Sequence, residues 1–371
     1  MSAECRPDFG LPESYRMLRE ELSIWARLKR FPLSATFELT PFCNLNCPMC
    51  YVHLDPATAA KQGKILSGKQ WLEIAAQAKE MGLLFVTLSG GEPFLHPDFW
   101  EIYNGLTEMG ILVDIYSNGC LINEGIVEKL KANPPVNMKI SMYGASDETY
   151  ETMCRYKNGF TKLDRALGLL REAGLPFYCT SLVVNENLHD LAAMYEYTRE
   201  RKIRFFHTIS VASSVRGSIN TAETSKINLV GHNWTLEGLE KERHTRRYLD
   251  PFQLCAGYGI TMFMTWHGHL QFCAFSPKPY VQMGYGAEMA SAWKELLAMT
   301  DQIQTPKECE TCEWHEFCRR CPGLMASESG DPNVLSPKFC QQAKDLYHVY
   351  QKLKAAEGQA NAGGESENKQ N

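Results

Sequence analysis

The stretch FELTPFCNLNCPMCYVH, residues 37–53, carries three cysteines in the spacing Cys-x3-Cys-x2-Cys. They are Cys43, Cys47 and Cys50. Three thiolates this close can hold three corners of a cubane iron–sulfur cluster, and the fourth iron is then free to bind and activate a small molecule. Pro41 and Pro48 disfavour a helix, so we predict a loop after a short strand over 35–39. A zinc site is the alternative for the same spacing.

Predicted strands and helices alternate along the chain from this loop to about residue 211. The strands are rich in apolar residues and cover 35–39, 83–88, 112–116, 138–142, 177–184 and 204–211. The helices lie between them, over 69–80, 97–108, 124–132, 147–172 with a break, and 190–201. Apolar strands that alternate with helices are typical of a parallel sheet with helices outside, so we predict an α/β fold.

Polar or glycine-rich stretches follow four consecutive predicted strands. The cysteine loop (40–52) follows the first strand, LSGGEPF (88–94) the second, YSNG (116–119) the third and SMYG (141–144) the fourth. Strand–helix units of this kind wind right-handed and place their functional loops at the carboxyl ends of the strands. We therefore expect the four stretches to line one cavity.

This arrangement resembles the radical S-adenosylmethionine (SAM) enzymes, which carry the same three-cysteine spacing. The resemblance implies a partial (β/α)6 barrel and a [4Fe–4S] cluster whose open iron binds the amino and carboxylate groups of SAM. One electron from the cluster would split the sulfonium of SAM and yield a 5′-deoxyadenosyl radical, which abstracts a hydrogen atom from the substrate. Met49 departs from the family, which usually has an aromatic residue there, but a thioether can also pack on the adenine face.

The resemblance also implies which residues contact SAM. Gly90 and Gly91 let the backbone approach a ligand closely, and Glu92 offers a carboxylate for the SAM amino group. The predicted contacts to the ribose and the methionyl carboxylate are Ser117, Asn118, Ser141 and Arg155. A planar guanidinium suits the bidentate pairing expected of the arginine. Ordinary loop capping is the alternative role for Ser and Asn at such positions.

Seven further cysteines lie between residues 255 and 340. Their pattern is Cys-x12-Gly-x4-Cys, a gap, Cys-x2-Cys-x5-Cys-x2-Cys, a gap and a final Cys. This resembles the SPASM domain, a cysteine-rich domain of radical SAM enzymes that modify peptides and proteins. The last internal spacing in that family is usually three residues, and here it is two. A zinc ribbon is the alternative, but its paired cysteines usually lie about 15–20 residues apart.

The SPASM resemblance implies two auxiliary [4Fe–4S] clusters, and so three clusters in all. The outer one would be held by Cys309, Cys312, Cys318 and Cys340. The inner one would be held by Cys255, Cys273 and Cys321. Three cubanes need twelve ligands, whereas three plus seven cysteines supply ten. One vacancy belongs to SAM, and the other leaves an open or non-cysteine position on the inner cluster.

Composition narrows the class of protein. The chain has 371 residues, of which 44% are apolar, and this supports one large domain with a smaller one. The net charge of −5 gives no electrostatic basis for binding nucleic acid or an anionic membrane. We see no basic and apolar leader and no long apolar run, so we expect a cytoplasmic protein. Its fourteen cysteines are then expected to be ligands, because the cytosol keeps thiols reduced.

We predict five segments from these patterns. They are an N-terminal helical segment (1–34), the partial barrel (35–211), a bridging region (212–250), the SPASM domain (251–345) and a C-terminal segment (346–371). The leader helix has apolar residues at helical spacing and is expected to cover one end of the barrel; they are Tyr15, Leu18, Leu22, Trp25 and Leu28. We also expect a β-hairpin with Gly268 in its turn, a helix over 343–357 and disorder from Gly358.

The combined resemblance implies an enzyme that modifies a ribosomally made peptide by a thioether or carbon–carbon crosslink, with a flavodoxin or ferredoxin as electron donor. Catalytic acids or bases cannot be assigned from the sequence. The alternatives are a sulfatase-maturing formylglycine-forming enzyme, a tetrapyrrole side-chain enzyme of haem synthesis, and a peptide epimerase with Cys154 or Cys179 as hydrogen donor. A non-catalytic electron-transfer protein is the alternative from another class, and GGEP argues against it because electron transfer needs no SAM pocket.

Overall fold

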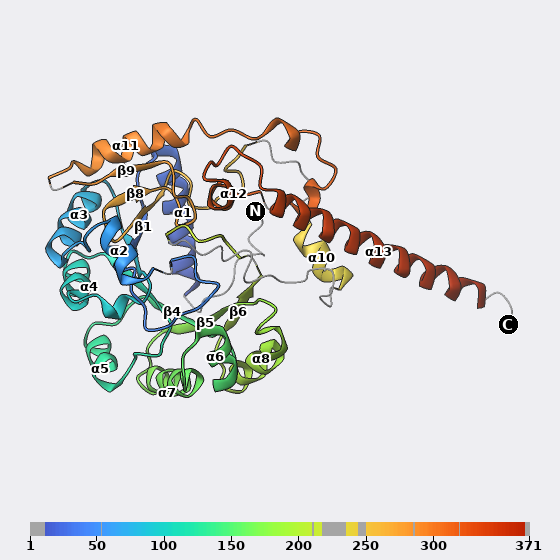
Figure 1. The fold of residues 1–371 in the computed structure, drawn as a ribbon, viewed down its shortest axis with the longest axis horizontal. Coiled ribbons are helices and arrows are strands. Elements are labelled where there is room, and N and C mark those ends of the chain that lie inside the picture. The colour runs from blue at the N-terminus through green and yellow to red at the C-terminus, as the bar shows by residue number, and fades with distance from the viewer. Residues whose placement is uncertain are drawn as a thin grey trace.

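The computed structural model describes residues 12–52, 54–209, 211–216, 235–243, 250–284, 286–318 and 320–367. Its strands form one sheet in the order β6-β5-β4-β3-β2-β1-β7-β8-β9 (Figure 1). All six predicted barrel strands are present and pair in parallel; they are β1 (Ser34–Glu38), β2 (Phe85–Ser89), β3 (Leu112–Ser117), β4 (Asn137–Ser141), β5 (Phe177–Leu182) and β6 (Phe205–Thr208). The predicted α/β fold with a parallel sheet is therefore confirmed.

The predicted helices cover the outer face of the curved sheet (Figure 1). They are α3 (Gly68–Glu80), α4 (Phe99–Glu108), α5 (Glu124–Ala132), α6 (Asp147–Cys154), α7 (Gly159–Glu172) and α8 (Leu191–Glu200). Several begin at side chains that accept a backbone N–H, as Ser67 does in a reciprocal capping box with Gln70. The predicted break between α6 and α7 falls at Arg155 and Asn158, which both have positive φ.

The two faces of the sheet differ in chemistry because successive side chains in a strand point to opposite sides. Phe37, Leu88 and Ile115 are fully buried against the helices, and Phe37 lies 4.8 Å from Trp71 between ring centroids. The opposite face lines the barrel interior and carries polar residues such as Glu38, Tyr116 and Lys139. The helix-facing layer thus holds the main core, and the interior is left for chemistry.

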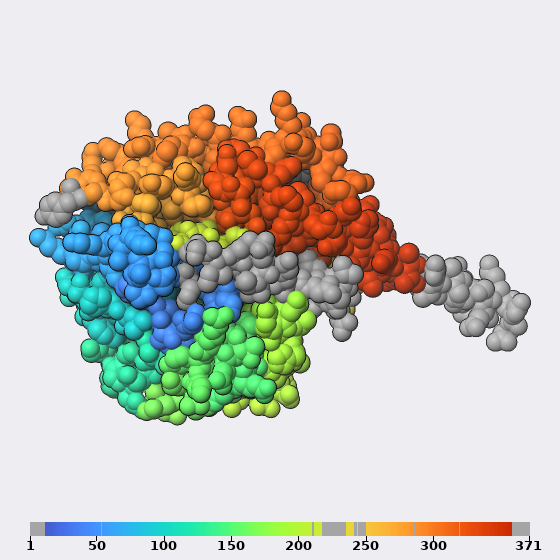
Figure 2. Space-filling model, in the orientation of Figure 1, coloured from blue at the N-terminus to red at the C-terminus, as the bar shows by residue number. Residues whose placement is uncertain are grey.

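The C-terminal region continues the barrel sheet. β7 (Thr261–Met264) pairs in parallel with β1, and it forms antiparallel pairs outward through β8 (His269–Gln271) to β9 (Tyr280–Gln282). The hairpin was predicted, and Gly268 lies in its turn with a φ of 91°. Its pairing with β1 was not predicted, because a contact between residues more than 200 positions apart leaves no local pattern. Figure 2 shows this region packed along one side of the barrel.

Several shorter elements were also not predicted. They are α2 (Pro56–Gln62), α10 (Leu236–Glu242), α11 (Met289–Thr300), α12 (Pro322–Ser329) and the 3₁₀ turns η2 (Pro93–Leu95), η3 (Leu188–Asp190), η4 (Lys307–Cys309) and η5 (His315–Phe317). The predicted bridging region contains α10, and its parts at 217–234 and 244–249 lie outside the described residues. No helix in the described ranges is long and apolar enough to cross a membrane.

The leader helix α1 (Glu13–Lys29) covers the amino ends of the strands, as expected. Its Ala26 packs with Phe85 and Ile260, and Tyr15 and Leu22 contact the same group. The predicted apolar face is wrong in part, because other residues counted in it point to solvent; Leu18, Trp25 and Leu28 are 55%, 60% and 74% exposed. The helix is 17 residues long, and only part of its surface packs against the strand ends.

The last helix is longer than the sequence predicts. α13 runs from Pro337 to Glu367, and it projects away from the barrel in Figure 1. The predicted disorder from Gly358 is therefore wrong up to Glu367, and residues 368–371 lie outside the described part. Extending an existing helix fixes one residue per hydrogen bond, so a packed helix can continue through a sequence of weak helix propensity.

Candidate active site

The cysteine loop is held against the ends of β1 and β2 by backbone hydrogen bonds. Gly91 N–H donates to Thr40 C=O at 2.7 Å, and Glu92 N–H donates to Phe42 C=O at 2.8 Å. A Cβ on Gly91 would lie 2.3 Å from the Phe42 carbonyl oxygen, so no side chain fits there. Gly90 has a φ of 146° and equally little space, with the Thr40 oxygen 2.6 Å from where its Cβ would be. Glycine is therefore required at both positions, because the GGEP stretch and the cysteine loop approach too closely for a side chain.

The three predicted cluster cysteines lie together on this loop. Burial, together with the nearby Glu92, Cys50 and Cys47, raises the pKa of the Cys43 thiol to about 12. Cys43 Sγ accepts hydrogen bonds from Leu45 N–H at 3.4 Å and from the Asn118 amide at 3.5 Å. Among the described residues, no three His, Cys, Asp or Glu side chains surround a point that fits a single metal ion.

Glu92 ties the SAM-binding stretches predicted on β2 and β3 to each other. Its carboxylate is fully buried and accepts the Ser117 hydroxyl at 2.9 Å and the Asn118 N–H at 2.8 Å. Burial raises the pKa of Glu92 to about 7, and these hydrogen bonds oppose the rise. The side-chain amide of Asn118 in turn donates to Asn44 at 2.8 Å. These residues thus position the cysteine loop, and their predicted contacts with SAM stay predictions.

The other predicted SAM contacts lie around the same loop. Ser141 ends β4 and hydrogen-bonds the phenol of Tyr143, a residue that sequence reasoning missed although SMYG was singled out. A hydrogen bond with Cys154 and burial raise the pKa of the Cys47 thiol. Arg155 is exposed and lies close enough to this thiol to oppose the rise. Met49 is only 4% exposed and packs in the main core, which leaves little of it for an adenine ring.

The residues around the cysteine loop fit an iron–sulfur cluster. Cys43, Cys47 and Cys50 are the thiols that the loop offers, and soft thiolates select such clusters. The Asn44 side-chain nitrogen is buried without a hydrogen-bond partner and lies beside Cys43, where it could donate to cluster sulfur. When bound, the cluster would supply an electron to SAM.

The interior of the barrel carries a row of polar side chains below these loops. Tyr116, Lys139 and Tyr178 are neighbours in the register of β3, β4 and β5. Lys139 Nζ lies 3.6 Å from the centroid of the Tyr116 ring, and burial lowers the pKa of this lysine to about 8. Nothing in the sequence distinguished Lys139 from a surface lysine. Its place on the interior face of a central strand is what makes it a candidate substrate contact.

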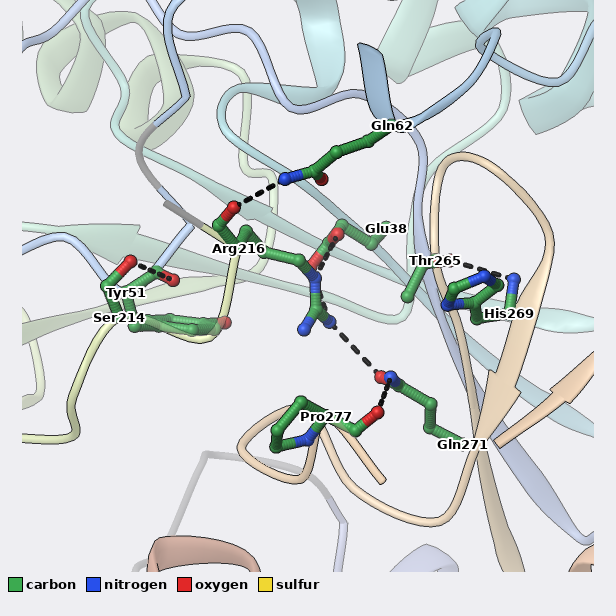
Figure 3. A network of polar contacts seen from close by, with 9 residues as sticks. All are labelled: Glu38, Tyr51, Gln62, Ser214, Arg216, Thr265, His269, Gln271 and Pro277. Carbon is green, nitrogen blue, oxygen red and sulfur yellow. Dashed lines mark hydrogen bonds and ion pairs between the residues drawn. The ribbon is translucent and has the colours of Figure 1, made fainter. Parts of the chain in front are cut away.

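A buried ion pair closes the barrel where β1 meets the C-terminal region (Figure 3). Arg216 donates to the Glu38 carboxylate at 3.1 and 3.3 Å and to Gln271 at 3.3 Å. Gln62 donates to the backbone carbonyl of Arg216 at 2.8 Å. Both charged side chains are at most 4% exposed, so removing either partner would leave a costly unpaired charge. This pair links the barrel to the hairpin.

The cysteines predicted for the inner auxiliary cluster come together next to this pair. Burial, together with the nearby thiols of Cys321 and Cys255, raises the pKa of Cys273 to about 12. The Gly323 Cβ position lies 2.8 Å from the Cys273 sulfur, so α12 begins directly against the thiol. Tyr51, from the cysteine loop, packs on Phe275 at 5.2 Å between ring centroids. The two predicted cluster sites are thus neighbours across one aromatic contact.

The cysteines predicted for the outer cluster line one cavity of about 490 Å³; they are Cys309, Cys312, Cys318 and Cys340. Burial, together with the three other thiols, raises the pKa of Cys318 to about 11. The structure thus gathers these four cysteines in one cavity, and their role as ligands of an outer cluster stays a prediction. A cavity with four thiols at its wall fits a cubane cluster.

Three cysteines in the described part of the chain lie outside the predicted cluster sites, and all three are buried. Cys179 is fully buried and packs in the helix-facing core with Ile140 and Leu167. Cys154 is also fully buried, and its thiol contacts Cys47. Cys120 is 8% exposed and its thiol donates to the Gly159 carbonyl. Of the two hydrogen-donor candidates, Cys179 therefore lies on the helix-facing side of the sheet, whereas Cys154 lies against the cysteine loop.

Comparison with known proteins agrees with this geometry. The family model described as the Radical SAM superfamily matches residues 37–198. The chain belongs to the radical SAM superfamily and is a radical SAM enzyme. Membership implies SAM and one [4Fe–4S] cluster as cofactors.

Individual relatives resemble different extents of the chain. An AdoMet-dependent heme synthase of Methanosarcina barkeri is 25% identical over 81% of this chain and 94% of its own length. A PqqA peptide cyclase of Granulibacter bethesdensis is 29% identical, but the match spans only 44% of this chain and 43% of that protein. The crystal structure of Streptococcus suis SuiB bound to precursor peptide SuiA shares the fold, with a TM-score of 0.63 and 17% identity over 89% of this chain and 82% of that one.

Proposed function

We propose that this enzyme cleaves SAM reductively and uses the 5′-deoxyadenosyl radical to modify a ribosomally made peptide, with two auxiliary [4Fe–4S] clusters. The observation that carries the proposal is the direct contact between the cysteine loop and the inner cysteine set, through Tyr51 and Phe275. A SAM site next to a second group of buried thiols suits a reaction in which an electron must leave the substrate after hydrogen abstraction.

The chain's own residues have distinct tasks in this proposal. Cys43, Cys47 and Cys50 would hold the cluster that binds SAM. Glu92 and Asn118 keep the three strand-end loops in register around it, through the hydrogen bonds described above. Tyr116 and Lys139 face the space below SAM, and the lysine would bind a carboxylate or carbonyl oxygen of the substrate.

The auxiliary clusters belong to the proposal as well. Cys255, Cys273 and Cys321 would hold the inner cluster, and the four thiols of the cavity would hold the outer one. A peptide substrate is supported by the PqqA peptide cyclase relative and by a thiol-rich region next to the barrel. The electron donor would be a small flavodoxin or ferredoxin, because the first step needs a potential near the low end of the range of about −700 to +450 mV.

A second candidate is modification of a tetrapyrrole side chain. The heme synthase relative is matched over 94% of its length, whereas the peptide cyclase is matched over 43%. A tetrapyrrole carries several carboxylates, and the half-buried Lys139 could pair with one of them. This candidate differs from the first only in the substrate, so the experiment must compare substrates directly.

The test is an anaerobic reconstitution followed by incubation with SAM and dithionite. We expect about twelve irons per chain and formation of 5′-deoxyadenosine, and its absence with intact clusters would contradict the proposal. An iron count near four would remove the auxiliary clusters from it. The substrate arm compares a short peptide encoded beside the gene with a carboxylated tetrapyrrole. Deuterium transfer from the labelled compound into 5′-deoxyadenosine identifies the true substrate.

A further inference from the structure

The outer cysteine cavity contains a buried cation. Arg320 lines this cavity together with the four cysteines and is only 8% exposed. Arginine is rarely buried without a partner, because removing a charge from water is costly. The Nη2 atom of Arg320 is nevertheless buried with no hydrogen-bond partner. The cavity therefore has a free cationic donor at its wall.

Two contacts of Arg320 are directed at cysteines. Its guanidinium hydrogen-bonds the thiol of Cys309, and its backbone N–H donates to the sulfur of Cys318. The acidic residues that line the cavity, Glu308 and Glu313, are exposed, and in the described part of the chain neither forms an ion pair with Arg320. The cation is therefore paired with sulfur rather than with a carboxylate.

The position of Arg320 in the sequence explains why it is buried. It stands in the shortened Cys-x2-Cys segment, between the outer-site Cys318 and the inner-site Cys321. A two-residue link between ligands of two different sites leaves little freedom to turn the side chain outward. α12 then begins at Pro322, immediately after Cys321, and holds the end of the link in place.

We propose that Arg320 is a positioning residue of the outer cluster, which donates to a thiolate ligand and holds the reduction potential of that cluster above the value it would otherwise have. The inference rests on the proposed function, because it requires a cluster on these four cysteines. Reduction adds a negative charge to the cluster, and a buried cation beside it stabilises the reduced form. Hydrogen bonds to the sulfur ligands act in the same direction.

The experiment compares Arg320→Gln and Arg320→Lys with the unchanged protein, each reconstituted anaerobically. Iron is counted, and the clusters are titrated potentiometrically with detection by electron paramagnetic resonance. We expect Arg320→Gln to keep its iron and to disfavour reduction of one cluster at least tenfold, a shift of about 59 mV to more negative potential. Arg320→Lys keeps the charge and should shift that cluster less.

The control is Arg243→Gln, because Arg243 lies in the same region and pairs with the Glu316 carboxylate at 2.9 Å instead of with a thiol. It should leave every potential unchanged. The proposal is wrong if Arg320→Gln keeps both its iron and its potential, or if Arg320→Lys shifts the potential as far. If Arg320→Gln loses about four irons, the proposal is supported only when Arg320→Lys keeps these irons and its cluster keeps the original reduction potential. Equal loss of iron in both variants contradicts the proposal.

A failure of the proposed function is recognised separately. Cys312→Ala removes an outer ligand without touching Arg320, and it should lower the iron count by about four. If the iron count of Cys312→Ala equals that of the unchanged protein, no outer cluster exists and the proposed function fails at that point. If iron is lost there but the potentials of the Arg320 variants do not move, only the inference about Arg320 fails.

Discussion

The cysteine loop and the outer cysteine cavity both gather thiols, but they are built differently. The cysteine loop lies on the main core, is pinned by backbone hydrogen bonds to the ends of β1 and β2, and is cross-linked to β3 through Glu92. The outer thiols lie on short 3₁₀ turns and at the start of α13, beside a small apolar cluster of Leu239, Phe317 and Tyr350. We infer that the barrel organises the first site before metal binds, whereas metal would organise the second.

The largest expected effect separates the two sites by their chemistry. Cys47→Ala should abolish formation of 5′-deoxyadenosine, by more than about 10³-fold, because SAM is no longer activated. Cys312→Ala should leave uncoupled SAM cleavage within about threefold of the unchanged protein, since that reaction needs only the first cluster. The measurement is 5′-deoxyadenosine per chain after anaerobic incubation with dithionite. Equal losses in the two variants would show that the sites are not independent.

Removal of iron should act unequally on the two regions. After anaerobic chelation, amide hydrogen exchange in residues 306–340 should accelerate by at least tenfold, because few buried apolar contacts hold these turns together. Exchange in β2 and β3 should change by less than threefold. Mass spectrometry of peptides from the native and the iron-free protein measures both. Uniform acceleration across the chain would contradict the proposed difference in preorganisation.

A third prediction tests how tightly the barrel site is packed. Gly91→Ala places a methyl carbon only 2.3 Å from the Phe42 carbonyl oxygen. This is too close for two non-bonded atoms, so the cysteine loop must shift. We expect the free energy of unfolding to fall by about 1–3 kcal/mol and SAM cleavage to fall at least tenfold. Gly168→Ala in α7 is the matched control, because nothing lies within 4 Å of its Cβ position. Alanine should leave stability there unchanged or higher.

The smallest effect concerns the pH dependence of the barrel. Burial raises the pKa of Glu92 from 4.5 to about 7, so the folded chain binds this proton more tightly than the unfolded chain. The resulting stability is complete below pH 4.5 and is lost as pH rises through 7. Between pH 6 and 8 the loss is about 1 kcal/mol. Glu92→Gln should remove this slope, as measured by denaturant unfolding at both pH values, and an unchanged slope would contradict the assignment.

Most of the barrel could be predicted from the sequence because its signals are local. The apolar run of β1 and the glycines that follow β2 are each recognisable within about ten residues. The same holds for the spacing of Cys43, Cys47 and Cys50. The exposed face of α1 could not be predicted, because the pattern shows that a helix is amphipathic but not how wide a surface will cover it. The burial of Met49 in the core likewise could not be predicted from the sequence.

The sequence supplied candidate ligands for the site but not the contacts that support them. Closely spaced cysteines indicate a metal site, since few other roles require several thiols so close together. The partners of Glu92 could not be derived, because Ser117 and Asn118 lie 25 and 26 residues away on another strand. Tyr51 and Lys139 were missed for the same reason. Each contacts a residue that is distant in the sequence, Phe275 and Tyr116 respectively.

The sequence by itself determined the class of chemistry and the order of strands and helices, because thiol spacing and hydrophobic periodicity are properties of neighbouring residues. Only the tertiary structure decided that β7 joins β1, that Arg216 pairs with Glu38, and that Arg320 is buried among thiols. Each of these depends on which distant segments meet, and on the free energy of burying a charge or a backbone group where they meet. That free energy belongs to the packed chain and has no counterpart in a local pattern.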